Sequence, residues 1–375
     1  MENSNRVSFA ALSPYIERTI ITPKESTNAG RNWVQWGDKN AYPDYIAGLF
    51  GTVTTLRTVI LGVVDYVVGN GSTEVGWERQ RATINRKGQT LRAFLKESAK
   101  SVAQFGGCFW QLIPDRMGRL AEMYVLRPEF VRVSKEQDVF FYSEKWNKGF
   151  GDALTFGKWL GAFAQDKDGN YLPAVFYLQQ WGDNVYPEPL YAAAVKACEV
   201  ERNIDEFHLG NIERGFMGSY VVNFNNGAPA TDEIKREIER DFTRKFGGAS
   251  NAGRIMFAYN DDKDHAVLLQ KMEVSDYGEK YETLSKHCRQ QIFTAFRANP
   301  NLFGIPTESL GFSSEEYESA FKLFNRTIVA PIQDAITEAW GLCTGGTLTI
   351  DPFTLDGAEQ TSTTGDDAAI TKEGE

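Results

Sequence analysis

The residues of this chain that could do chemistry are few, and their spacing suits neither a metal site nor a nucleophilic pair. Only His208, His265 and His287 occur as histidines, and none has another histidine or a cysteine at zinc-ligand spacing. His287 and Cys288 are neighbours on an expected helix, so their side chains should point about a quarter-turn apart. That geometry is poor for a nucleophile and its base, and we expect a core or interface role for both.

Two loops resemble ligand-binding motifs only superficially. Asp261, Asp262 and Asp264 could bind a cation, but their loop lacks the spacing and the terminal glutamate of a calcium loop. The stretch 247–253, GGASNAG, follows an expected helix and precedes a strand, and it has no Gly-Lys-Ser/Thr. We therefore expect a solvated turn and a linker. We predict no metal, no cofactor and no catalytic residue, and we expect that the chain is not an enzyme.

Five basic residues lie between positions 235 and 245, interleaved with acidic ones. A solvated helix face is the simplest interpretation, but one side of it could contact a phosphate or a partner protein. The five are Lys235, Arg236, Arg240, Arg244 and Lys245.

Composition narrows the class of protein. Of 375 residues, 42% are hydrophobic and 13% aromatic, enough for a sizeable core, so disorder is excluded for most of the chain. The formal net charge is −10, whereas a protein that holds DNA tightly is usually basic. Nucleic acid could still slide past such a chain. Four cysteines, none close to another in sequence, predict free buried thiols in a reducing compartment.

Nothing in the sequence predicts a membrane segment. The N-terminal MENSNRVSF lacks a basic region followed by an apolar run. The most apolar stretch, 59–68, is too short to span a bilayer and contains Asp65. We expect a chain made in a cytoplasm, with no membrane contact.

The most informative stretch is 293–340, which predicts a helix, a loop marked by proline and glycine, and a long amphipathic helix. The first helix should start near Asp276 and end by Ala298 or Asn299, ahead of Pro300. Ser313 should cap the second, and Pro331 should bend it. Its apolar stripe comprises Tyr317, Phe321, Phe324, Ile328, Ile332, Ala335 and Ala339.

Other elements follow from periodicity and turn residues. Helices are expected from about Pro43, over 54–68, over 91–105 and over about 190–207. Residues 108–134 alternate and predict two or three antiparallel strands, with a turn at 115–118. The stretches 138–146 and 171–181 continue the β pattern, with a turn at 166–170. Residues 211–274 form a small module: a strand at 218–224, a helix from Thr231 to about 246, and strands at 254–259 and 266–272. A short strand should follow Leu342, and a tail from about 355 should be disordered.

The order of these parts resembles the portal proteins of tailed bacteriophages and prophages, from about residue 100 to 340. The pieces that carry the resemblance are PEPLYAAA (187–194), FRANPNLFGI (296–305) and FNRTIVAPIQDAITEAW (324–340). Each is a loose pattern, and their order is the specific part.

The resemblance implies an α+β portal fold with a wing, a two-helix stem, a small α/β clip, a tunnel loop and a kinked long helix. Because little follows Trp340, the crown should be reduced or absent. The implied parts are an arm (1–30), wing (31–187), stem helix 1 (188–210), clip (211–274), stem helix 2 (275–298), tunnel loop (299–313), long wing helix (314–342), and a short β segment with the tail (343–375).

The resemblance also implies a function. Portal proteins form dodecameric rings at one capsid vertex of the virion, assembled in the host bacterial cytoplasm, and double-stranded DNA passes through them during packaging and ejection. Partners would be the large terminase, docking with the basic residues of the clip, the major capsid or scaffold protein, and a head-completion adaptor. Loop residues facing DNA would be Ile305, Thr307, Glu308, Ser309, Leu310 and Phe312. Since Glu308 is the only charge in the loop, it could pass phosphates without holding them.

Two other hypotheses are weaker. Another structural capsid or connector protein would share the composition, but it does not predict a helix–module–helix–loop–helix order. A nucleic-acid-processing enzyme or nucleotide-dependent motor would need a phosphate loop or grouped metal-binding carboxylates, and the sequence shows neither.

Overall fold

The computed structural model describes residues 20–27, 31–77, 83–146, 153–213, 220–224, 231–234, 236–238, 240, 255–259, 277–305 and 314–354. Their contacts divide them into two compact units. One is formed by Lys196–Gln291, and the other by Ile21–Val195 with the part that begins at Ile292. Mixed helix and sheet confirm the predicted α+β class.

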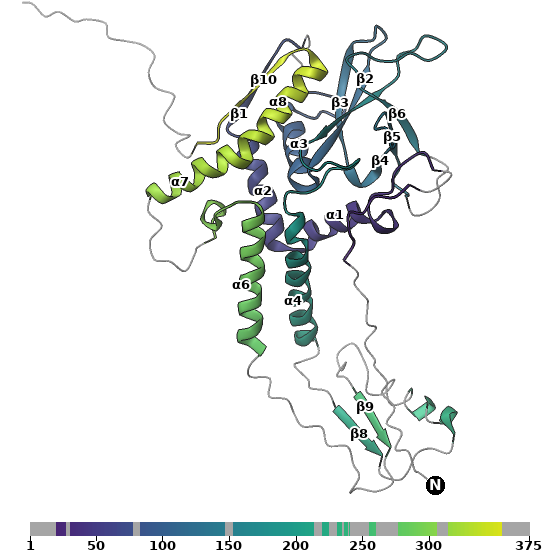
Figure 1. Ribbon diagram of the computed structural model, residues 1–375, viewed down its shortest axis with the longest axis vertical. Coiled ribbons are helices and arrows are strands. Elements are labelled where there is room, and N and C mark those ends of the chain that lie inside the picture. Colours follow the sequence, from purple (N-terminus) through teal and green to yellow (C-terminus); the bar gives the residue numbers. More distant parts are fainter. Residues whose placement is uncertain are drawn as a thin grey trace, which may run out of the picture. The chain divides into compact units, whose positions relative to one another are not determined.

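Three helices open the larger unit, as predicted: α1 (Tyr42–Thr52), α2 (Thr54–Val68) and α3 (Leu91–Phe105) (Figure 1). The boundaries of α3 follow from local chemistry. The Thr90 side chain accepts a hydrogen bond from the Ala93 amide, and Gly106 ends the helix in a left-handed conformation (φ 91°).

No single helix of the described residues is both long enough and apolar enough to cross a membrane. The bent pair α1 and α2, whose axes differ by 96°, would suffice by length and composition. Most of its apolar residues, among them Leu49, Leu56, Val59 and Ile60, are buried inside the unit, whereas Leu61 is exposed.

The centre of this unit is a six-stranded sheet with strand order β3-β2-β7-β6-β5-β4. The strands are β2 (Gly107–Pro114), β3 (Leu120–Leu126), β4 (Val131–Val133), β5 (Val139–Tyr142), β6 (Leu154–Lys158) and β7 (Ala174–Gln179). All described neighbours are antiparallel except β6 and β7, which pair in parallel. The alternation in the sequence predicted most of these strands, but it did not predict β6.

Aromatic side chains join the helices to the sheet. Trp110 of β2 donates from its indole nitrogen to the Ser98 hydroxyl of α3 at 2.9 Å. Phe94 packs against both Trp110 and Trp340, with ring centroids 5.1 and 6.1 Å apart. Trp36, Trp110 and Trp340 are fully buried and form part of the core of this unit.

The long C-terminal helix is interrupted one turn earlier than expected. It consists of α7 (Ser314–Phe324), a π-helical segment (Asn325–Val329) and α8 (Ala330–Thr344). Pro331 has no N–H for the carbonyl of Thr327 four residues earlier, so the hydrogen-bond ladder widens ahead of the proline. Phe324, Ile328, Ile332 and Ala339 are buried as predicted, but Ile336 takes the buried place expected of Ala335. A strand, β10 (Thr347–Asp351), then pairs antiparallel with β1 (Gly71–Val75).

The described part of the smaller unit consists mainly of two helices and two strands (Figure 1). These are α4 (Val195–Glu213), α6 (Tyr277–Ala295), β8 (Tyr220–Phe224) and β9 (Ile255–Tyr259). Phe207 of α4 packs on Tyr281 of α6, and Cys198 of α4 lies close enough to Cys288 of α6 for that thiol to help raise its pKa. Because the later residue of α4 meets the earlier residue of α6, the two helices run antiparallel. The two strands pair in parallel, as a strand–crossover–strand connection requires. The strand predicted at 266–272 lies outside the described residues.

Candidate functional site

The expected tunnel loop is described only at its two ends. Of its six candidate residues, Ile305 is half-buried, and its amide donates to the Pro300 carbonyl at 3.2 Å. The other five lie outside the described residues: Thr307, Glu308, Ser309, Leu310 and Phe312. Their place in a DNA channel therefore stays a prediction. The structure describes the anchors of the loop, 296–305 before it and the start of α7 after it.

The upstream anchor is a tightly organised turn. Phe296 is buried, and its ring stacks on Tyr191 with centroids 5.2 Å apart. Arg297 adopts a left-handed conformation (φ 51°), which ends α6 three residues before the position that Pro300 led us to expect. The Asn299 side chain then accepts from the Asn301 amide at 3.0 Å and caps a 3-10 helix, η5 (Pro300–Phe303). Gly304, also left-handed (φ 73°), redirects the chain toward Ile305.

Tyr66 of α2 holds both anchors. Its hydroxyl donates to the Leu302 carbonyl at 2.6 Å, upstream of the loop. Downstream of the loop, its ring packs against Phe321 and Phe324 of α7, with centroids 5.6 Å away in each case. Phe303 closes the set, because its ring lies 6.0 Å from Tyr66 and 5.7 Å from Phe324. Each such ring pair adds about 0.5–1.5 kcal/mol beyond burial, so the cluster fixes where the loop leaves and rejoins the fold.

A glycine and a second tyrosine complete this aromatic cluster. A Cβ at Gly62, one turn before Tyr66, would lie 2.4 Å from the Phe303 ring, so only glycine leaves room for it. Burial raises the pKa of Tyr66, and its hydrogen bond with Tyr317 raises it further. The sequence predicted a buried α2 but gave no sign that Tyr66 would meet residues near 302 and 324.

The candidate partner-binding residues of the smaller unit are described only in part. Arg236 and Arg240 are exposed on a helical segment that Thr231 begins, since its hydroxyl accepts from the Ile234 amide at 3.4 Å. Lys235, Arg244 and Lys245 lie outside the described residues. The two described arginines are thus accessible, and their contact with a partner remains a prediction.

His287 and Cys288 point apart, as their spacing predicts. His287 is exposed and hydrogen-bonds to Gln291, with 2.9 Å between the nitrogens, whereas Cys288 is 2% exposed. All four cysteines are free and buried, which confirms the prediction made for them. Burial raises the pKa of Cys198 to about 12 and also raises the pKa of Cys288. Within the described ranges, no three histidine, cysteine or acidic side chains come together as metal ligands would.

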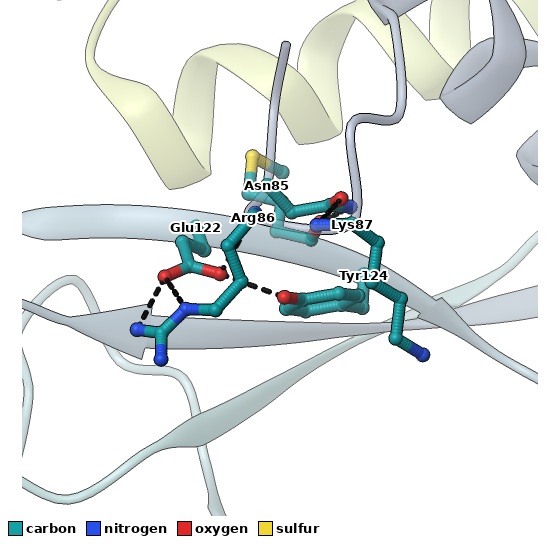
Figure 2. Close-up of polar contacts among 6 residues, drawn as sticks. Asn85, Arg86, Lys87, Glu122 and Tyr124 are labelled. Atoms are coloured by element: carbon teal, nitrogen blue, oxygen red, sulfur yellow. Dashed lines mark hydrogen bonds and ion pairs between the residues drawn. The ribbon is translucent and has the colours of Figure 1, made fainter.

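Sequence reasoning missed a groove in the larger unit, with a volume of about 1050 Å³, between α3 and the sheet. Figure 2 shows its polar wall, where the Arg86 guanidinium and the Tyr124 hydroxyl both reach the Glu122 carboxylate. Arg86 pairs with Glu122 at 2.7 Å, and Tyr124 donates to the other carboxylate oxygen at 2.7 Å. The one available signal was the spacing of two between Glu122 and Tyr124, which places both on one face of a strand.

Comparison with known proteins gives matches among solved structures only. No protein-family model matches the chain, and no curated protein does. A chain in the neck of the native gene transfer agent particle, computed with C12 symmetry, is 17% identical, with a TM-score of 0.51 over 82% of this chain and 84% of that one. The chain has the fold of this neck protein.

Three further solved structures are similar to the chain. The virion of the native gene transfer agent particle contains a chain with 18% identity and a TM-score of 0.52, with 84% of each chain covered. The neck of the empty particle, computed with C6 symmetry, matches at 16% identity and a TM-score of 0.50, covering 84% of this chain and 85% of that one. An HK97-family phage portal protein from Corynebacterium diphtheriae is 12% identical, with a TM-score of 0.47 over 82% of this chain and 94% of that one.

The chain whose sequence resembles tailed-phage portal proteins thus shares its fold with neck and virion chains of the gene transfer agent particle. Two of the sequence pieces that carry this resemblance meet in space, because Tyr191 of the 187–194 piece stacks on Phe296 of the 296–305 piece. Tyr191 also donates to the Gln104 carbonyl at 3.0 Å, so the neck fold joins α3 to the upstream anchor at this point. The division into wing, stem, clip and tunnel loop remains a prediction.

Proposed function

We propose that the chain is the subunit of a portal, a ring-shaped channel that forms the head–tail connector at one capsid vertex. The observation that carries this proposal is the fold shared with a chain of a neck that was computed with C12 symmetry, across more than four-fifths of both chains. A twelve-fold ring places identical subunits head to tail, so one face of each subunit must fit a different face of the next.

In this proposal the parts have distinct roles. Residues 31–187 and the long helix 314–342 form the wing, 188–210 and 275–298 the stem, and 211–274 the clip. The loop 299–313 projects into the channel, and its residues Ile305 to Phe312 face the DNA as the DNA moves through. The aromatic cluster around Tyr66 supports this role, because a loop that acts on moving DNA needs fixed ends.

The charge balance suits passage of DNA better than tight binding. Repeated strong phosphate contacts would hold the duplex in place, whereas an acidic chain with few placed cations lets it move. The chain would therefore act mechanically, without covalent chemistry of its own. Packaging would be powered by the large terminase, which docks at the clip.

Further partners follow from a place at the vertex. The clip, with the exposed Arg236 and Arg240, would meet the large terminase first and a head-completion adaptor later. The wing would meet the major capsid or scaffold protein. Assembly would take place in the host bacterial cytoplasm before the virion is complete.

The test is the size and symmetry of the purified full-length chain, by native mass spectrometry and electron microscopy. Twelve copies of the 42.1 kDa chain amount to about 505 kDa, seen end-on as rings with a central hole. A chain that stays monomeric or dimeric at micromolar concentration, both alone and when co-expressed with the capsid and scaffold proteins of its particle, would refute the proposal.

A further inference from the structure

The groove between α3 and the sheet has an apolar floor. Apolar side chains from four elements meet there, and the exposed fraction of Leu154 on β6 is 61%. They are Phe50, Ile113, Leu126, Leu154 and Phe156. A groove of this volume with an exposed leucine suits a short stretch of extended polypeptide with small apolar side chains.

The rim of the groove presents positive charge outward, although acidic residues also line it. Glu122 and Glu129 lie beneath arginines, with side-chain exposures of 6% and 9%. Their partners Arg86 and Arg127, at 2.7 and 2.8 Å, are 79% and 66% exposed. An occupant of the groove therefore meets guanidinium groups before it meets carboxylates.

Two lysines extend this rim without pairing to a buried carboxylate. The Lys87 ammonium lies 5.4 Å from the centre of the Tyr124 ring, and Lys100 lies 4.6 Å from the centre of Phe50. Glu97 is the exposed acidic residue of the groove, and it accepts a hydrogen bond from Gln89 at 2.9 Å. The lining thus carries four cations against three carboxylates, a small excess of positive charge on a chain whose formal net charge is −10.

We infer that this groove binds the acidic segment 355–375 of the same chain. The segment carries six acidic residues and one lysine. Within it, Asp366 and Asp367 directly precede Ala368, Ala369 and Ile370. The acidic pair would meet the rim, and the three small apolar side chains would cover the floor.

The point where the segment begins favours this occupant over any other acidic polypeptide. Thr354, the residue before it, accepts a hydrogen bond from the Asn70 side chain at 2.8 Å. Arg92, in the first turn of α3, donates to the carbonyls of Asn70 and Gly69 at 3.3 and 3.1 Å. Lys100, on the same helix, lines the groove.

The segment is also long enough to reach the groove. The 15 residues of α3 extend over about 22 Å. The 21 residues of the segment can span up to about 70 Å. A tether that starts near the first turn of α3 raises the local concentration of the segment, so modest intrinsic affinity is enough for occupancy.

Binding is tested with a fluorescent peptide of residues 355–375 and the chain ended after Thr354. We expect saturable binding that Lys87→Glu/Lys100→Glu weakens about tenfold, because two attractions become repulsions while both buried glutamates keep their arginines. The matched control is Arg116→Glu/Lys135→Glu, which reverses two exposed charges away from the groove and should leave binding unchanged. Circular dichroism and melting temperature establish that each variant is folded.

Two further measurements do not depend on variants of the groove. A peptide with Asp366→Asn/Asp367→Asn should bind about tenfold more weakly, with the groove itself untouched. In the full chain, a photo-crosslinker at position 370 should join to groove residues such as Tyr124. No saturable binding, equal binding by the groove variant and the control variant, or crosslinks confined to other surfaces would each overturn the inference.

The competing occupant is nucleic acid, and the same assay separates the two. A DNA duplex that displaces the peptide at lower concentration than unlabelled peptide does, and that itself loses affinity with Lys87→Glu/Lys100→Glu, would overturn the inference in favour of DNA. The inference does not rest on the proposed ring, because a monomeric chain with an occupied groove would leave it intact.

Discussion

The hydroxyl of Tyr66 donates a 2.6 Å hydrogen bond to the carbonyl of Leu302, 236 residues later in the chain. It joins α2, a buried helix, to the turn from which residues 306–313 depart. The ring of the same tyrosine contacts Phe324, where the chain has returned. One side chain thus fixes two points of the backbone that the proposed function requires to be held.

Removing the hydroxyl of Tyr66 should destabilise the larger unit modestly, and removing its ring should destabilise it strongly. We expect Tyr66→Phe to lower the free energy of unfolding by about 1 kcal/mol, through loss of the bond to Leu302. Tyr66→Ala should lower it by about 3–5 kcal/mol, because a cavity opens among the rings of Phe303, Phe321, Phe324 and Phe353. Urea unfolding monitored by tryptophan fluorescence measures the stability of both variants. Tyr171→Phe, outside the cluster, is the control. Equal stability of Tyr66→Ala and wild type would show that the cluster does not hold the anchors.

Glycines 62 and 48 make a matched pair for the same cluster. Gly62→Ala places a methyl group 2.4 Å from the Phe303 ring, so we expect a loss of about 1–3 kcal/mol. Gly48→Ala, in α1 with no heavy atom within 4 Å of the new Cβ, should stabilise the helix by about 0.5–1 kcal/mol. Thermal unfolding distinguishes the two directions. If Phe303→Leu did not partly restore Gly62→Ala, the clash with Phe303 would not be the cause.

Acid should weaken the fold partly through Glu122. Burial alone would raise the pKa of this carboxyl, but hydrogen bonds from Arg86 and Tyr124 bring it below the ordinary 4.5. A carboxyl whose pKa is lower in the folded chain stabilises the fold above its unfolded pKa and loses that contribution as pH falls below it. Glu122→Gln should therefore cost about 1–3 kcal/mol at pH 7 and flatten the decline of stability below about pH 4.5. Glu136→Gln, an exposed carboxylate, serves as control, and an acid limb unchanged in Glu122→Gln would contradict the assignment.

The cysteines should resist alkylation in the folded chain. Burial raises the pKa of the Cys198 thiol to about 12, and it raises the pKa values of the Cys108, Cys288 and Cys343 thiols as well. Thiolate is the reactive form, so iodoacetamide at pH 8 should modify these residues slowly in buffer and rapidly in denaturant, as mass spectrometry can count. Rapid modification of Cys288 in native buffer would mean that α4 and α6 separate readily near Cys288.

A positive charge placed in the proposed tunnel loop should slow the passage of DNA. Glu308→Lys would put a ring of twelve cations into the channel if the proposed portal is right, and each would attract phosphate. We expect fewer filled particles from an in vitro packaging reaction, with a stronger effect at low salt because counterions screen the contact. Glu136→Lys has the same charge change on the wing. If packaging were unchanged with Glu308→Lys, or with residues 306–312 deleted, the loop would not line the channel.

Sequence alone determined the elements whose limits depend on neighbouring residues. Thr90 and Gly106 mark the ends of α3 through a cap and a left-handed residue, both of which act within one turn. Periodicity identified α2 and the buried line of α7 and α8, because an apolar stripe is a local property of a helix. The order of these elements carried the resemblance to portal proteins, and comparison of folds gives a neck chain of the gene transfer agent particle with the same fold.

Only the tertiary structure decided which distant residues meet. The approach of Tyr66 to Leu302, the parallel pairing of β6 with β7 and the burial of Glu122 under Arg86 depend on contacts between segments far apart in the chain. No local propensity encodes such contacts, since each is selected by the packing of the whole unit. The same reason explains the π segment ahead of Pro331. The proline requires a break in the ladder, but the burial of Ile328, Ile332 and Ile336 together selects where the break falls.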